Sequence, residues 1–261
     1  MAEKYYAGID VGSHSTEAVI IDDNKQQLSF SIIDTGLDGN AAAENALNLA
    51  LAKIGINREN LNGIVATGYG RANVTNAGKQ VTEITCHATG AHHIFPQAGT
   101  VIDMGGQDSK VIHIDENGQL VDFVMNDKCA AGTGRFLEVM AKRLGSDLDQ
   151  FGNLALLSEQ AVPISNTCTV FAESEVVSLL AKNHPRDQII RGLHQAIVDR
   201  IWAQSQTVGI HGAVIMTGGV ALNQGVIQLL EDKLKCELLV PPQPQIVGAL
   251  GAALIAHRNF R

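Results

Sequence analysis

Apolar and polar residues alternate in the same order along two segments of the chain. GIDVGSHSTEAVIID, residues 8–22, aligns with VIDMGGQDSKVIHID, residues 101–115, at a constant offset of 93. Each segment predicts a strand that ends in Asp, a glycine turn and a second strand. The offset pairs Asp10 with Asp103 and Gly12 with Gly105. Two copies of one hairpin predict two related α/β halves.

The remaining pattern predicts further elements around these hairpins. Alternation predicts strands over 27–34, 63–67 and 119–125, and AVIMTGG predicts another that ends in a glycine turn. Helical spacing predicts helices over 41–54, 132–144, 168–181, 187–207 and 247–258, and a further one within VALNQGVIQLLEDKLK. Phe136 and Met140 are expected in the core. The boundary falls near Gly99, which gives a first half of residues 1–98 plus 246–261 and a second half of 99–245. Because no low-complexity linker separates the halves, a tight hinge is expected.

The glycine turns predict a nucleotide site between the halves. Such turns expose backbone N–H groups that can hold phosphate oxygens, and a carboxylate from each half can hold hydrated Mg²⁺. Asp10 and Asp103 are the predicted Mg²⁺ residues, and Gln107 and Asp108 are expected near the attacking water. The predicted ATP-binding residues are Gly12, Ser13, His14, Ser15, Thr16, Gly105, Gly106, Gly132, Gly134, Gly218, Gly219 and Gln245.

Composition narrows the class of protein. The chain has 261 residues, a length typical of roughly two domains, and is 45% hydrophobic. A net charge of −8 argues against nucleic acid or a membrane surface as partner. No apolar run of about 18 residues and no signal-peptide pattern occur, so a cytoplasmic protein without membrane contact is expected. The cysteines are expected to be reduced thiols or metal ligands. They are Cys86, Cys129, Cys168 and Cys236.

Five motifs carry a resemblance to a known family. They are TGYGR (67–71), EITCHA (83–88), VIDMGGQDSK (101–110), NDKCAAGTGRFLE (126–138) and PQIVGALGAA (244–253). The sequence resembles the activators of 2-hydroxyacyl-CoA dehydratases and the related benzoyl-CoA reductase ATPase subunits. These belong to the actin, sugar-kinase and heat-shock-protein ATPase superfamily. The resemblance implies a duplicated actin-like, ribonuclease-H-like fold and an ATP-hydrolysing homodimer with one [4Fe–4S] cluster between its subunits.

The resemblance also implies a function and its partners. A reduced ferredoxin or flavodoxin would supply single electrons, and ATP hydrolysis would drive them to a dehydratase or reductase under anaerobic conditions. The alternative enzyme is a metabolite kinase of the same fold, with Asp103 or Asp108 as general base. A nucleotide-gated regulator or chaperone is a third reading, but it leaves the thiols unexplained.

Two thiols lie where helices are expected to begin. Cys129 precedes the glycines of CAAGTG, and Cys168 follows possible capping residues in SNTC. Helix starts favour thiolates, whereas a small buried side chain is the usual fate of a free Cys. With the family motifs, Cys129 and Cys168 are the expected ligands of a cluster shared with the second subunit. Cys86 and Cys236 are expected in the core.

Two further sets of residues bear on the predicted site. The family often has Lys where this chain has Glu17, whose repeat partner is Lys110. Three readings follow: Mg²⁺ and backbone alone neutralise the phosphates on that side, another cation substitutes, or Glu17 points to solvent. In CHATGAHH, a zinc site at Cys86, His87, His92 and His93 is disfavoured by spacing, and the histidines are expected in solvent or near the hinge.

Overall fold

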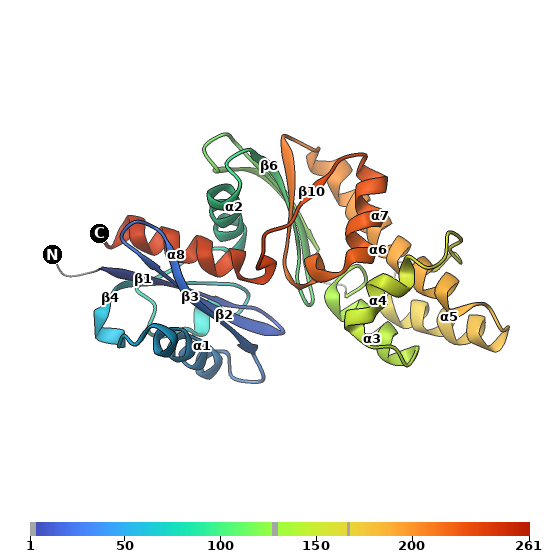
Figure 1. Ribbon diagram of the computed structural model, residues 1–261, viewed down its shortest axis with the longest axis horizontal. Coiled ribbons are helices and arrows are strands. Elements are labelled where there is room, and N and C mark those ends of the chain that lie inside the picture. The colour runs from blue at the N-terminus through green and yellow to red at the C-terminus, as the bar shows by residue number, and fades with distance from the viewer. Residues whose placement is uncertain (1–3, 127–129, 166–167) are drawn as a thin grey trace.

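The computed structural model describes residues 4–126, 130–165 and 168–261, and two five-stranded sheets organise them (Figure 1). The first sheet has the order β3-β2-β1-β4-β5 and the second β10-β9-β6-β7-β8. The first contains β1 (Tyr5–Val11), β2 (Ser15–Asp22), β3 (Gln27–Asp34), β4 (Leu61–Thr67) and β5 (Lys79–Gln80). The second contains β6 (Ala98–Met104), β7 (Ser109–Ile114), β8 (Leu120–Asn126), β9 (Ala213–Thr217) and β10 (Leu238–Leu239). The predicted α/β class is confirmed.

The two sheets repeat one pairing scheme. β1 pairs antiparallel with β2 and parallel with β4, as β6 does with β7 and β9. In the first sheet Asp10 is the register partner of both Glu17 and Thr67. In the second, Asp103 is the partner of both Lys110 and Thr217. The structural repeat therefore extends beyond the hairpin to a third strand that ends in Thr-Gly.

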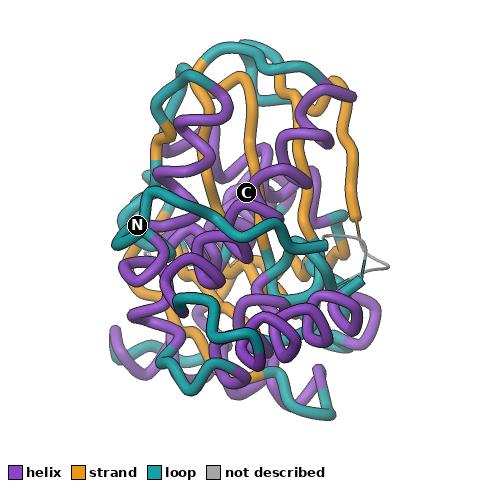
Figure 2. Tube along the Cα trace, turned by 90° about the vertical axis from the view of Figure 1, so that its right-hand side faces the viewer, coloured by secondary structure: helices purple, strands orange, loops and turns teal. Residues whose placement is uncertain are grey.

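Helices cover both faces of each sheet. α1 (Gly39–Ile54) packs on one face of the first sheet and α8 (Val247–Asn259) on the other, so the chain returns to the first half at its end (Figure 1). α6 (Arg186–Val208) and α7 (Gln224–Leu234) pack on the second sheet. α3 (Gly134–Arg143), α4 (Leu148–Ala155) and α5 (Thr169–Ala181) extend this half, and helices cover that end of the molecule (Figure 2).

α2 (Glu83–Ile94) lies between the halves and was not predicted. Its backbone approaches that of α8 closely: a Cβ on Gly251 would lie 1.8 Å from the carbonyl oxygen of Cys86. On its other side, Ile84, Ala88 and Ala91 share a core with Val101 and Ile215 of the second sheet. A helix buried on two sides shows no single apolar stripe, which explains why periodicity did not reveal it.

Most predicted elements match those observed. The strand predicted over 27–34 matches β3, and the helices over 168–181 and 187–207 match α5 and α6 to within a residue. α3 begins two residues later than predicted, after Gly132 with its left-handed φ of 85°. The short helix α4 was missed. Phe136 and Met140 are buried in the core, as predicted.

Candidate functional site

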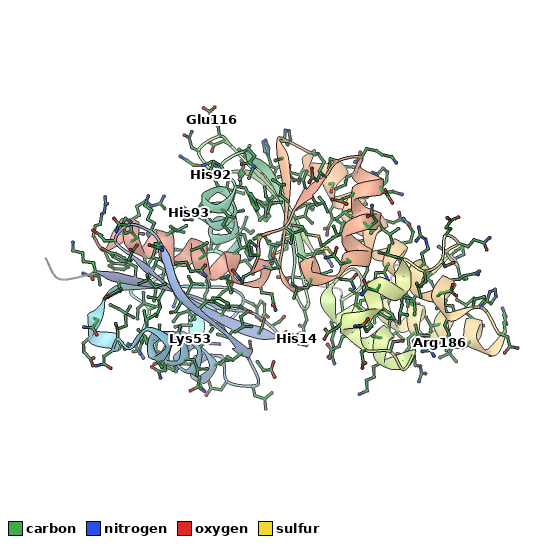
Figure 3. All side chains as sticks on the ribbon, in the orientation of Figure 1. His14, Lys53, His92, His93, Glu116 and Arg186 are labelled. Atoms are coloured by element: carbon green, nitrogen blue, oxygen red, sulfur yellow. The ribbon has the colours of Figure 1, made fainter. Side chains whose placement is uncertain are left out.

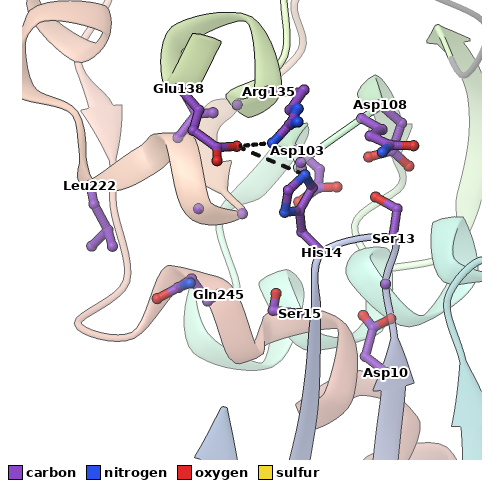
Figure 4. Close-up of a pocket in the computed structure, with 18 of the residues that line it drawn as sticks. Asp10, Ser13, His14, Ser15, Asp103, Asp108, Arg135, Glu138, Leu222 and Gln245 are labelled. Atoms are coloured by element: carbon purple, nitrogen blue, oxygen red, sulfur yellow. Dashed lines mark hydrogen bonds and ion pairs between the residues drawn. The ribbon is translucent and has the colours of Figure 1, made fainter. Parts of the chain in front are cut away.

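A cleft of about 520 Å³ lies between the halves and is lined by both repeated hairpins. Figure 4 shows Asp10 and Ser13 from the first hairpin near Asp103 and Asp108 from the second. The cleft brings together most residues predicted from sequence: Asp10, Gly12, Ser13, His14, Ser15, Asp103, Gly105, Gly106, Gln107, Asp108, Gly134, Gly218, Gly219 and Gln245.

Two predicted ATP-binding residues do not line the cleft. Thr16 is fully buried, and its hydroxyl lies 2.9 Å from that of Thr35. Gly132 lies against α6 instead, since a Cβ at this position would be 2.5 Å from Cδ of Arg200. Each residue therefore serves the packing of its own half.

The two hairpin turns have the same internal hydrogen bond. The amide of Gly12 donates to the Ser15 carbonyl at 3.0 Å, and the amide of Gly105 donates to the Asp108 carbonyl at 3.0 Å. Gln107 is exposed at the tip of the second turn, within the cleft. The turns thus present small side chains and backbone from both sides to one space.

Asp103 is surrounded by groups that stabilise its charge. Thr217 Oγ1 donates to Oδ1 at 2.8 Å, and Lys110 Nζ donates to Oδ2 at 3.0 Å. His87 Nδ1 lies 3.4 Å from Oδ1. Burial would raise the pKa of Asp103, but His87, Lys110 and Thr217 outweigh it and lower the pKa to about 2. Asp103 is therefore a fixed anion with both oxygens engaged.

Asp10 has far fewer partners. Its carboxylate is buried, and its one described ion-pair contact is His87 Nε2 at 3.8 Å from Oδ2. Burial raises the pKa of Asp10 to about 6, although His87 partly opposes this. Glycines enclose the group: a Cβ on Gly248 would lie 2.1 Å from Oδ2, and one on Gly68 2.3 Å from Oδ1. Of the two carboxylates, Asp10 has oxygens free to coordinate Mg²⁺, so the donor set fits that ion.

Glu17 does not point to solvent. It is 4% exposed, lines the cleft and lies opposite Asp10 on the neighbouring strand. Burial raises the pKa of Glu17 well above its usual range, and the charge of Asp10 raises it further. Its repeat partner Lys110 is equally buried but contacts Asp103, Asp108 and Glu83 at 3.0, 2.7 and 3.5 Å.

His87 is the site residue that sequence reasoning missed. It was expected in solvent or near the hinge, yet it is buried between Asp10 and Asp103 and links the two halves. It comes from the first turns of α2, whereas His92 and His93 lie farther along that helix, away from His14 (Figure 3). Helical spacing from Glu83, which also lines the cleft, is the signal that could have placed His87 there.

α3 is joined directly to the second turn. The amide of Gly134 donates to the Gly105 carbonyl at 2.9 Å, and the amide of Arg135 donates to the Gly106 carbonyl at 2.8 Å. The first amides of this helix are therefore not free to bind an anion. At the far end, Arg143 Nε lies 3.3 Å from Glu173 Oε1 on α5.

A polar contact crosses the cleft beside this junction. His14 of the first turn lies 4.0 Å from Glu138 of α3, and Glu138 also pairs with Arg135 at 2.8 Å (Figure 4). A Cβ on Gly106 would lie 2.7 Å from the His14 ring. The two turns therefore touch across the cleft.

The three described thiols, of Cys86, Cys168 and Cys236, lie apart from the cleft lining. Cys129 lies outside the described residues, so its predicted role rests on sequence. Cys168 is half-buried and caps the start of α5, next to exposed Val170 and Phe171. Cys86 is fully buried and Cys236 packs against the core of the second half, as predicted. Within the described ranges, no group of three or more His, Cys, Asp or Glu is arranged to hold a metal ion.

Comparison with known proteins decides the family. Residues 7–256 match the family model described as "BadF/BadG/BcrA/BcrD ATPase family". The chain belongs to this ATPase family. The activator of lactoyl-CoA dehydratase from Anaerotignum propionicum is 47% identical over 253 residues, 97% of each chain. The resemblance inferred from the motifs is thereby confirmed.

Two solved structures of family members share the fold throughout. Component A of (R)-2-hydroxyglutaryl-CoA dehydratase from Acidaminococcus fermentans superposes with a TM-score of 0.93 at 45% identity, covering 97% of this chain and 98% of that one. The activator of 2-hydroxyisocaproyl-CoA dehydratase from Clostridium difficile, solved with bound ADPNP, gives 0.92 at 42% identity, covering 97% and 94%. The predicted actin-like fold is thus confirmed for this ATPase.

In the described part of the chain, no helix combines the length and apolar composition that crossing a bilayer requires.

Proposed function

We propose that this ATPase is an iron–sulfur activator that passes single electrons at low potential to a partner 2-hydroxyacyl-CoA dehydratase or a related reductase. The observation that carries the proposal is end-to-end similarity to dehydratase activators, combined with a cleft lined by both predicted carboxylates. The proposal includes a cytoplasmic, anaerobic setting and a ferredoxin or flavodoxin as electron donor.

The cleft supplies the groups for ATP hydrolysis. Asp10 and Asp103 would hold hydrated Mg²⁺, which supplies charge stabilisation to the phosphates. The Asp103 carboxylate is fixed by Lys110 and Thr217, so it keeps one orientation. Gln107 is exposed at the turn and free to orient water, whereas Asp108 is held by Lys110 at 2.7 Å. In this arrangement Gln107 is the positioning residue for the attacking water.

The cluster would be held by Cys129, which precedes α3 in the sequence, and by Cys168, which begins α5. Cys168 is the N-cap residue of α5 and is partly exposed, so its thiol can reach a group bound at the surface of this half. A [4Fe–4S] cluster needs four thiolates and, when bound, supplies one-electron transfer. Cys129 and Cys168 would hold it together with the same pair from a second subunit. Val170 and Phe171, each more than 60% exposed beside Cys168, suit such a subunit contact.

Substitution of each thiol tests this assignment. Cys129→Ser and Cys168→Ser should each abolish iron and acid-labile sulfide, because each removes two ligands per dimer. Cys86→Ser and Cys236→Ser serve as matched controls and should retain iron, because both thiols pack in cores. Iron at the wild-type level in Cys129→Ser or Cys168→Ser would contradict the proposal. Oxygen should bleach the wild-type protein.

A further inference from the structure

The cleft carries a strong excess of negative charge. Among the described residues that line it, eight are Asp or Glu and two are Lys or Arg. Of those two, Lys110 contacts three carboxylates and Arg135 is paired with Glu138. A nucleotide polyphosphate entering this space therefore needs cations to accompany it.

The excess of negative charge is distributed unevenly between the two repeats. In the second half, Asp103 lies opposite Lys110 on the neighbouring strand, and the pair is in direct contact at 3.0 Å. In the first half, Asp10 lies opposite Glu17, and both side chains are more than nine-tenths buried. Like charges directly opposite on a sheet destabilise each other, so the same register position is compensated in one half and not in the other.

The threonine hydroxyl groups at the ends of β4 and β9 differ between the two halves in the same way. Thr217 donates to Asp103 at 2.8 Å. Thr67, its counterpart opposite Asp10, is fully buried, and among the described residues its hydroxyl has no hydrogen-bond partner beyond the Cys86 thiol. Within the described ranges, the one side-chain hydrogen bond of Glu17 is to the neighbouring Ser15 hydroxyl. Side-chain oxygen atoms on the two strands beside β1, those of Glu17 and Thr67, thus occupy the register positions opposite Asp10.

We propose that Asp10 and Glu17 form a subsite for a second hard cation, K⁺ or Mg²⁺, which compensates the first half as the Lys110 ammonium compensates the second. Hard cations take oxygen ligands of this kind, with nucleotide phosphate or water completing the shell. The inference rests on the proposed nucleotide binding. It makes Glu17 a determinant of which cations this ATPase needs, beyond the ion that accompanies the nucleotide itself.

The test measures ADP affinity by calorimetry on the anaerobic, iron-loaded protein. In one arm, K⁺ replaces tetramethylammonium at constant ionic strength and fixed Mg²⁺. In the other arm, free Mg²⁺ is raised above the amount that saturates ADP, without K⁺. In the arm whose cation occupies the subsite, the affinity of the wild-type protein for ADP should rise about tenfold or more. This is the scale of a close charge pair in a protein site. The arm that responds identifies the cation.

Substitutions at Glu17 decide whether the effect belongs to this subsite. Glu17→Gln should lose the cation response, and Glu17→Lys should bind ADP tightly without the added cation. Asp34→Asn removes another carboxylate from the cleft lining and should keep the wild-type response. If Glu17→Gln does not fold, the Glu17→Lys titration still decides.

The outcomes separate this inference from the function on which it rests. An equal cation response in wild type, Glu17→Gln and Glu17→Lys would overturn the subsite and leave Glu17 as a neutral buried acid, with nucleotide binding intact. A lack of response in both arms would overturn it equally. No ADP binding by folded wild-type protein under any condition would overturn the proposed function itself.

Discussion

Asp103 differs from Asp10 because of its neighbours, although the repeat gives the two residues the same place. Lys110, Thr217 and His87 hold Asp103 as an anion, whereas burial dominates at Asp10. Asp103→Asn should reduce ATP turnover by about 10² or more, because it removes a preorganised charge beside the phosphates. Turnover by the iron-loaded protein measures this, with circular dichroism to verify the fold. Asp122→Asn, on the exposed face of β8, is the control and should keep full activity.

The raised pKa of Asp10 predicts an unusual pH response. Its folded pKa of about 6 exceeds the ordinary value of 3.8, so the folded state gains protons first as pH falls. Without Mg²⁺ and nucleotide, the free energy of unfolding should therefore rise between pH 7 and pH 5, by about 1.3 kcal/mol from Asp10 alone. Asp103, with its lowered pKa, contributes stability that is lost only as pH falls through about 2.

Asp10→Asn checks the sign of this response. The variant lacks the titrating group, so urea unfolding at pH 7 and pH 5 should show a smaller rise than in wild type. Glu17 faces Asp10 and also has a raised pKa, so some rise should remain. An equal rise in both proteins would mean that Asp10 is not the residue responsible.

Sequence predicted the two aligned carboxylates of the repeat and the glycine turns of the cleft, and it missed His87. Asp10 and Asp103 were found because a 93-residue offset aligns them, and the structure places both in the cleft. His87 has no counterpart in the repeat, so no pattern distinguished it from His92 and His93. The burial of Glu17 was equally hidden, because β2 is buried on both faces and alternation carries no information there.

At the scale of elements, backbone contact between α2 and α8 sets how the halves meet. Gly251→Ala would place its Cβ 1.8 Å from the Cys86 carbonyl oxygen, which cannot move without moving α2. Unfolding in urea should show a loss of about 1–3 kcal/mol. Arg258→Ala, exposed on the same helix, should change stability by no more than about 0.5 kcal/mol. Equal stability of the two variants would refute this close packing.

Helices with one apolar face were predictable, and helices buried on two sides were not. α3 presents Phe136, Leu137 and Met140 to the core and a charged face to solvent, so periodicity revealed it. α2 is buried by both halves, and α4 is only eight residues long. Tertiary packing, which one sequence does not display, determines where such elements lie.

For the whole molecule, the cleft and the start of α5 are connected through described contacts. The second turn holds α3 through two backbone hydrogen bonds, and Arg143 of α3 pairs with Glu173 of α5, the helix that Cys168 begins. A change in the turn on nucleotide binding therefore has a physical route to Cys168.

Nucleotide state should consequently change access to the cluster. The rate at which a chelator removes iron, and the affinity for the partner enzyme, should differ among nucleotide-free, ADP and non-hydrolysable ATP forms. A coupling of about 1–3 kcal/mol corresponds to a change of 5–150-fold. Identical rates and affinities in all three forms would exclude the coupling even if the cluster is present.

The length of α3 and its fixed start suit this helix to act as a lever between the cleft and α5. Ten residues make a rod of about 15 Å, since an α-helix rises 1.5 Å per residue. Because its first amides donate hydrogen bonds to the carbonyls of Gly105 and Gly106, the start of the helix should move together with the turn. A tilt of about 10° at the turn would displace Arg143 at the far end of the helix by about 2.6 Å. Two backbone hydrogen bonds would in this way convert a small rotation at the cleft into a larger displacement of the α3 end that contacts α5.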